Sequence, residues 1–232
     1  MCNQLKVEFY KFRHFWLFYL AVIFMAAVGF SYGLIKLARL GYDSYDAVRT
    51  TGCDTSFMFI LVLVSAWFIG SDFSNRTIHH EITLGYSRWS VLLVRALPVL
   101  LSGILLHFIY AVSCMIGVGS KTGFSGNMFC MQDLFWGITI LLQLMALQSI
   151  DLFLSFICAS APSAIVVSVS VIMIACNVLR NFLEGTFFTK TVFYFAPDNT
   201  KETLVPTSAV AVMTLVVVMV STYLVFRKKE IK

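Results

Sequence analysis

Long apolar segments alternate with short polar segments along almost the whole chain. Six of the apolar segments are long enough to cross a membrane, and they occupy residues 15–35, 55–71, 92–118, 134–160, 163–184 and 206–226. About 20 apolar residues in a helix cross the hydrocarbon core of a bilayer. Because lipid offers no hydrogen-bond partners, only helices and closed barrels satisfy the backbone there. The pattern predicts an all-α, polytopic membrane protein in which residues 1–232 form a single transmembrane domain.

The composition supports this class. Hydrophobic residues make up 59% of the chain and charged residues only 12%, with a mean hydropathy of +0.85, whereas about 25% of the residues in a soluble domain are charged. The predicted spans fill most of the chain and leave no room for a soluble catalytic domain. We therefore expect a protein that is not an enzyme by itself.

The distribution of charge predicts the orientation. With six spans, both termini, the segment 72–95 and the turn at 161–162 lie on one side, which carries ten basic and four acidic residues. The opposite side carries seven of each. Cytoplasmic loops are enriched in Lys and Arg, so we expect both termini in the cytoplasm. The net charge of +5 follows from this topology and does not indicate nucleic-acid binding.

Two segments outside the spans have distinctive patterns. Leu5, Phe9, Phe12 and Trp16 recur at helical spacing among charged residues, which predicts an amphipathic helix over 2–14 along the cytoplasmic interface. Residues 181–205 are rich in Phe and Tyr, which favour the headgroup region. We expect a re-entrant or interfacial segment there, between spans five and six, followed by Pro206 in the first turn of the sixth span.

Polar residues inside the spans are the next candidates. One face of the fourth predicted span carries four polar residues, and these are Gln143, Gln148, Asp151 and Ser155. An ionisable group in a span is costly and is a functional hypothesis by default. The stripe is open to three interpretations, namely structural pairing with another helix, lining of a pathway, and proton coupling. In the first span, the glycines of Gly29-Phe30-Ser31-Tyr32-Gly33 permit close approach of another helix.

Motifs for metals and nucleotides are absent from the sequence. His79-His80-Glu81 lacks the second His one turn later that a zinc site of the H-E-x-x-H type needs. In "GVGSKTG" at 117–123 a Ser stands where a phosphate loop needs Gly before Lys. We expect no metal and no nucleotide on this chain. Cys53 and Cys130 lie on the predicted outer side, where a disulfide between them is one option.

The polar segment at 72–95, "DFSNRTIHHEITLGYSRWSVLLVR", separates the second and third spans. Ser74 or Thr77 is a suitable cap for a short helix over about 74–84, and Gly85 ends that helix. Ser87 then caps the third span, which holds Arg88 and Arg95 near the anionic leaflet. The segment therefore predicts a short cytoplasmic helix between two membrane helices.

This segment resembles the permeases of ABC-2 type ABC transporters. An acidic residue, a small-Thr pair, Leu-x-x-Ser-Arg and a later basic residue recur in that family. The corresponding residues here are Asp72, Arg76-Thr77, Leu84-Gly85-Tyr86-Ser87-Arg88 and Arg95. Arg76 departs from the pattern, because the family commonly has Gly there. The six-span layout is similar to the same family, and the size is similar to small bacterial permeases of bacteriocin or lantibiotic immunity and peptide-antibiotic export.

The resemblance implies a function and a set of partners. The chain would be the membrane-spanning subunit of an exporter in the bacterial cell membrane, moving a peptide or a hydrophobic or amphipathic compound. It would pair with a second permease, identical or a sister chain, over two cytosolic ATPase subunits that bind ATP and Mg²⁺, so this chain needs no cofactor. The implied ATPase-docking residues are Asp72, Arg76, Thr77, Leu84, Gly85, Ser87 and Arg88.

Two other classes of protein remain as alternatives. One is a secondary transporter or channel that uses Asp151 as an intramembrane ion or proton site. The other is an accessory membrane protein without a transport role. A transporter of the first kind would depend on an ion gradient rather than on ATP.

Overall fold

The computed structural model describes residues 2–54, 57–124, 131–174 and 201–229. Within these ranges every regular element is a helix. The first half contains α1 (Cys2–Arg13), α2 (Trp16–Tyr32), η1 (Gly33–Leu37), η2 (Ala38–Leu40), α3 (Ser44–Gly52), α4 (Met58–Ser74) and α5 (Thr77–Thr83). The second half contains α6 (Arg88–Thr122), α7 (Met131–Cys158), α8 (Ala161–Ile174) and α11 (Lys201–Lys228). The all-α class predicted from the sequence is confirmed.

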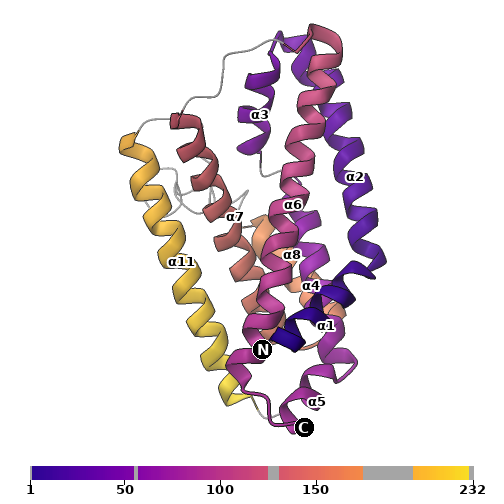
Figure 1. The fold of residues 1–232 in the computed structure, drawn as a ribbon, viewed down its shortest axis with the longest axis vertical. Helices are drawn as coiled ribbons and strands as arrows, with labels where there is room; N and C mark the ends of the chain where they lie inside the picture. The colour runs from indigo at the N-terminus through magenta and orange to yellow at the C-terminus, as the bar shows by residue number, and fades with distance from the viewer. Residues whose placement is uncertain (1, 55–56, 125–130, 175–200, 230–232) are drawn as a thin grey trace.

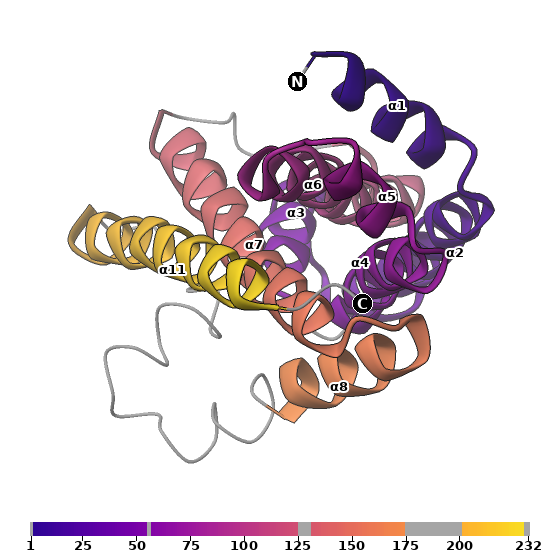
Figure 2. The same ribbon diagram turned by 90° about the horizontal axis from the view of Figure 1, so that it is seen from below.

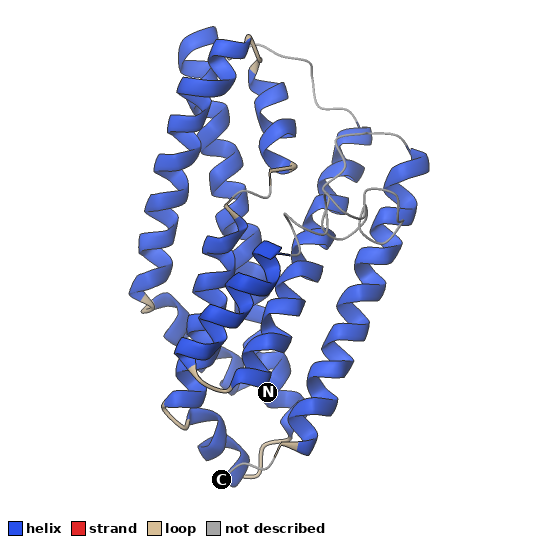
Figure 3. Cartoon of the chain, turned by 180° about the vertical axis from the view of Figure 1, so that it is seen from behind, coloured by secondary structure: helices blue, strands red, loops and turns tan. Residues whose placement is uncertain are grey.

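The long helices form an elongated bundle. In Figure 1, α2, α6, α7 and α11 extend along the long axis, with α1 and α5 at the lower end and α3 at the upper end. Figure 3 shows the same bundle from behind, with helices throughout the described residues. Viewed from below, α1 lies across the end of the bundle beside α5 and α6 (Figure 2). We call the end with α1 and α5 the α5 end.

The number of candidate spans is lower than the sequence predicts. Among the residues that the structure describes, four helices are long and apolar enough to cross a membrane, and they are Trp16–Leu40, Arg88–Thr122, Met131–Cys158 and Leu204–Lys228. The pair α4 and α5, bent by 56°, supplies a fifth if counted as one broken span. The described part of α8 has only 14 residues, or about 21 Å at 1.5 Å per residue. The remainder of the predicted span 163–184 lies outside the described residues. The long apolar helices indicate a membrane-embedded helical protein, with four or five candidate spans in the described part of the chain.

The glycines of the first span allow α2 and η1 to touch α6. A methyl group at Gly29 would lie 2.6 Å from the carbonyl oxygen of Tyr110, and one at Gly33 would lie 2.4 Å from that of Cys114. Such distances are too short for any larger residue, so the prediction of close backbone approach within the chain is confirmed. The first span is predicted to end at residue 35. In the structure its helix continues through a π turn (Gly33–Leu37) and a 3₁₀ turn (Ala38–Leu40).

The predicted features at the two ends of the chain have different outcomes. A helix is present at α1, as predicted over 2–14, and its Phe12 side chain packs into an apolar cluster with Phe68 and Phe15. The prediction for Pro206 is wrong, because α11 begins at Lys201 and therefore contains Pro206 in its second turn. Residues 201–205 are helical for the same reason, whereas 181–200 of the predicted re-entrant segment lie outside the described residues.

Candidate functional site

The short helix α5 lies at the surface of the α5 end, and one of its apolar side chains is fully buried. Ile78 is fully buried, whereas His80 and the residues 83–87 on the same connection are exposed. Leu84 and Tyr86 are 63% and 44% exposed. Apolar groups that protrude from a polar segment in this way are typical of a surface that contacts another protein.

The start of α5 differs from the prediction. Ser74 does not cap α5, since it is the last residue of α4 and its hydroxyl donates to the carbonyl of Gly70 at 3.0 Å. Thr77 is the first residue of α5 rather than its cap. The cap position is held by Arg76, whose φ of 56° and ψ of 18° are left-handed. Gly adopts this region freely, whereas a residue with a side chain such as Arg76 adopts it only with strain.

The end of α5 follows the prediction. Gly85 has a φ of 88°, and the amides of Gly85 and Tyr86 donate to the carbonyls of Ile82 and Glu81. This pair of hydrogen bonds is a Schellman motif, which needs a left-handed residue after the helix. Ser87 then accepts a hydrogen bond from the amide of Ser90 at 3.2 Å and caps α6. The tight turn between α5 and α6 is therefore encoded locally.

A buried ionic cluster joins α5 to its neighbours. The Arg95 side chain is completely enclosed. Its Nε lies 2.8 Å from Asp72 on α4, and its two terminal nitrogens contact the Glu81 carboxylate on α5 at 2.8 and 3.0 Å. Glu8 on α1 lies 3.9 Å away. The side chain of Arg95, predicted to lie near the anionic leaflet, is directed into the protein, where these three acids compensate its charge.

Glu8 and Lys11 complete the cluster from α1. Lys11 contacts Glu8 at 2.7 Å and Asp72 at 3.5 Å. Burial raises the pKa of Glu8 above its usual range, and the charge of Arg95 offsets that effect only in part. The second Glu8 oxygen is buried without a hydrogen-bond partner among the described residues. The cluster thus holds three acids and two bases from four helices, and it fixes α1, α4, α5 and α6 relative to one another.

Arg88 and Lys229 bind helix ends beside the cluster. The Arg88 guanidinium donates to the backbone carbonyls of Phe226, Arg227 and Lys229 at the end of α11. The Lys229 ammonium donates to the carbonyls of Phe156 and Ile157 at the end of α7, at 2.9 and 2.8 Å. Cations are favourable at helix C-termini, where carbonyls lack partners. The first residue of α6 is therefore attached to α11, and α11 to α7.

The predicted docking residues divide into two groups. Arg76, Thr77, Leu84, Gly85 and Ser87 lie on or beside α5 at the surface. Asp72 and Arg88 instead make contacts within the chain. Sequence reasoning missed the partners Glu8, Lys11 and Glu81. The sequence did hold a signal for the two acids, because Glu8 and Glu81 lie on the same predicted side of the membrane as Arg95.

The polar stripe of α7 is buried. Its members are Gln143, Gln148, Asp151 and Ser155, and none is more than 3% exposed. With its amide oriented to satisfy both neighbours, Gln148 donates to the carbonyl of Leu100 at 3.0 Å and accepts from the amide of Gly103 at 3.2 Å. Asp151 accepts a hydrogen bond from Ser65 on α4. Gln148 and one oxygen of Asp151 therefore pair with neighbouring helices, as the structural interpretation of the stripe expects.

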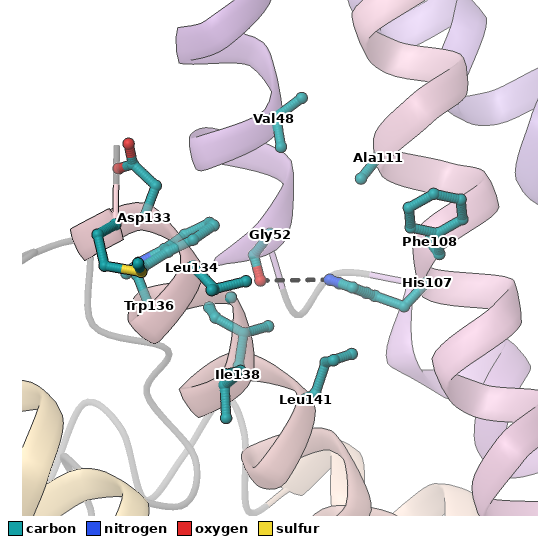
Figure 4. Close-up of a pocket in the computed structure, with 13 residues that line it drawn as sticks. Val48, Gly52, His107, Phe108, Ala111, Asp133, Leu134, Trp136, Ile138 and Leu141 are labelled. Atoms are coloured by element: carbon teal, nitrogen blue, oxygen red, sulfur yellow. Dashed lines mark hydrogen bonds between the residues drawn. The ribbon is translucent and has the colours of Figure 1, made fainter. Parts of the chain in front are cut away.

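A cavity lies toward the other end of the bundle. Its volume is about 610 Å³, and its walls come from α3, α6 and α7. Figure 4 shows Val48, Phe108, Leu134, Ile138 and Leu141 around it, with the His107 ring directed at the carbonyl of Gly52. Phe108 and Leu134 are largely exposed, so the cavity opens on the apolar outer surface. Its size and lining are those of a site for a drug-sized apolar group.

The two histidines of α5 show no metal-binding arrangement. No group of three or more His, Cys, Asp or Glu side chains suited to a metal ion occurs in the described part of the chain. Cys130 lies outside that part, so its pairing with Cys53 stays a prediction. Burial raises the pKa of the Cys53 thiol to about 11, which keeps it protonated at neutral pH.

Comparisons with known proteins identify no relative, so the proposal for the function rests on the residues of this chain alone. No model of a known protein family matches the sequence, and a search of curated proteins finds no matching relative.

Proposed function

We propose that this chain is the permease subunit of an ATP-binding cassette transporter in the bacterial plasma membrane, with both termini in the cytoplasm. The observation that carries the proposal is α5, an exposed helix between two apolar helices that a buried ionic cluster attaches to α1, α4 and α6. In this proposal α5 docks into a cytosolic ATPase, and its displacement on ATP binding moves the helices attached to it.

The assembly would contain two permeases and two ATPases. The second permease is either a copy of this chain or a sister chain. ATP and Mg²⁺ bind to the ATPase subunits, and this chain forms or breaks no bonds. Within this arrangement Leu84 and Tyr86 contact the ATPase, while Asp72 and Arg88 position α5 from inside the bundle.

The cavity supports an amphipathic or hydrophobic cargo. It is lined almost wholly by apolar side chains and opens beside Phe108 and Leu134 on the apolar surface. A cargo dissolved in the bilayer would enter it sideways without crossing water. Peptide antibiotics belong to this class, and export or immunity is the function that follows.

Asp151 supports a second candidate, a transporter driven by an ion gradient. The side chain is fully buried, and one of its oxygens lacks a hydrogen-bond partner among the described residues. The two candidates differ in their energy source. Transport that survives ATP depletion and stops when ion gradients collapse would favour the second, whereas the reverse result would favour the first.

Co-purification tests the docking. The chain is expressed with a candidate ABC ATPase from the same genome, and complex formation and ATPase activity are measured for wild type and for Leu84→Asp. Because the Leu84 side chain is exposed, we expect the variant to fold normally but to bind and stimulate the ATPase at least tenfold less. Tyr10→Ser, at an exposed site on α1, is the matched control. Equal binding by all three proteins would refute the docking assignment.

A further inference from the structure

The carboxyl group of Asp151 lies where three helices meet. Asp151 is on α7, its hydrogen-bond donor Ser65 is on α4, and Ser168 of α8 approaches the same carboxyl group. Ser155 follows Asp151 by one turn on the same face of α7. All four side chains are at most 1% exposed. The site is therefore a closed group of oxygen atoms inside the bundle.

Unpartnered polar atoms gather at this site. In the described residues five buried side-chain atoms lack a hydrogen bond of acceptable geometry. Three of them are here, namely Asp151 Oδ1, Ser155 Oγ and Ser168 Oγ. Buried polar atoms are nearly always paired, and leaving one unpaired costs about 1–3 kcal/mol. Three such atoms, on Asp151, on the serine that approaches its carboxyl group and on the serine one turn away, point to a ligand that they share.

The charge of the site is also uncompensated. Within the described residues, the side chains that act on the Asp151 carboxyl are the two serines, and neither is cationic. The other carboxylates on the adjoining helices are Asp72 on α4, which belongs to the ionic cluster, and Asp133 near the start of α7, while the described part of α8 carries no ionisable group. An isolated buried carboxylate is strongly unfavourable. One positive charge neutralises it, whereas a divalent ion would leave an excess charge in a medium of low dielectric constant.

We propose that Asp151, Ser65, Ser155 and Ser168 bind a monovalent metal cation such as Na⁺. Oxygen ligands suit hard cations. A proton bound to Asp151 would form one hydrogen bond and would leave the other unpartnered oxygens as they are. A cation at the centre of the site would contact the carboxylate and the serine oxygens at the same time. The Ser65 hydroxyl hydrogen is then free to donate to the backbone carbonyls of Leu61 or Val62, which lie 2.9 and 3.1 Å from its oxygen.

Thermal unfolding of the purified chain in lipid nanodiscs tests this site. Melting temperatures are compared in NaCl, KCl and choline chloride of equal concentration, over a range of pH. A cation at 100 times its dissociation constant should raise the melting temperature by roughly 5 °C or more relative to choline. Asp151→Asn should abolish the rise, and Asp46→Asn, the same change at a partly exposed site on α3, should retain it.

Two further variants keep the carboxylate of Asp151, so they test the site even if Asp151→Asn does not fold. Ser155→Ala and Ser168→Ala each remove one ligand oxygen, and each should raise the cation concentration needed for half of the stabilisation. Identical melting in all three salts would overturn the proposal, as would an unchanged salt response in Asp151→Asn. A melting temperature that varies with pH but not with cation, and loses that variation in Asp151→Asn, would assign a proton instead and also overturn it. None of these readouts involves an ATPase, so this proposal and the proposed function fail separately.

Discussion

At the residue scale, Arg95 holds the α5 end together through charges that come from distant parts of the sequence. Its partners Glu8, Asp72 and Glu81 are on three different helices. A buried ion pair has a small net effect on stability, because desolvation offsets the attraction, but removal of one partner leaves a buried charge uncompensated. The cluster is therefore more important for fixing the position of α5 than for the total stability.

Arg95→Met should destabilise the protein strongly. The change leaves Asp72 and Glu81 without their main partner, and removal of one member of a buried pair costs about 3–5 kcal/mol. Chemical unfolding in detergent micelles measures the loss. Arg13→Met, at an exposed site on α1, should lower the free energy of unfolding by less than about 0.5 kcal/mol. The assigned cluster is wrong if the two variants are equally stable.

Glu8 should make stability depend on pH in a characteristic direction. Because burial raises the pKa of Glu8 in the folded protein above its ordinary value of 4.5, the folded state binds the proton more tightly than the unfolded state. Its contribution to the free energy of unfolding is therefore greatest below pH 4.5 and decreases as the pH rises to the folded pKa. Glu8→Gln removes this trend, so wild type should lose stability relative to the variant over that interval. A constant difference between the two proteins from pH 4 to pH 8 would contradict the raised pKa.

At the element scale, α5 combines a strained start with a regular end. Arg76 holds a left-handed conformation that costs a residue other than Gly roughly 1–2 kcal/mol. Gly85 takes the same region without that cost. The left-handed backbone at Arg76 is therefore a position that Gly would occupy with less strain.

Arg76→Gly should stabilise the protein slightly. Relief of the left-handed strain exceeds the extra entropy that Gly has in the unfolded chain, and the net gain should be about 0.5–1 kcal/mol. Thermal unfolding measures it. Asn75→Gly is the control, because Asn75 has a φ of −84° and should lose stability on the same change. A loss of stability in both variants would show that the Arg76 side chain makes contacts that outweigh the strain.

The cavity between α3, α6 and α7 gives a prediction about transport. A side chain at Gly137, which lines the cavity, meets no atom within 4 Å of its Cβ, so Gly137→Phe should occupy the cavity without unfolding α7. We expect a several-fold loss of resistance in cells that depend on this chain for survival against peptide antibiotics. Val166→Phe, which places the same side chain at an exposed site on α8, should leave resistance intact. Full resistance with Gly137→Phe would exclude the cavity from the cargo pathway.

Sequence patterns predict the elements of this protein better than their contacts. Helices α2, α6, α7 and α11 follow from long apolar segments, and Gly85 and Ser87 mark the α5–α6 turn by local backbone chemistry alone. The ionic cluster depends on which acids approach Arg95 in space, and its partner Glu8 is 87 positions earlier in the chain. Helix α3 was missed because it is short and polar, although Asp43 caps it through the amide of Asp46.

At the scale of the whole molecule, α6 connects the two candidate regions. Arg88 and Arg95 at its beginning belong to the α5 end, and His107 and Phe108 line the cavity. Twelve residues separate Arg95 from His107, or about 18 Å of helix. Gln148 of α7 contacts α6 between them, beside Gly103. In the proposed mechanism a displacement of α5 would therefore reach the cavity through one continuous helix.

Site-specific cross-linking tests the docking of α5 most directly. A photoreactive amino acid replaces His80, which is exposed on α5, and the chain is expressed with a candidate ABC ATPase from the same genome. We expect a covalent adduct between the two proteins from position 80 and none from the same replacement of the exposed Tyr10 on α1. If the ATP-binding protein co-purifies but cross-links only from position 10, or from neither position, α5 is not the docking helix.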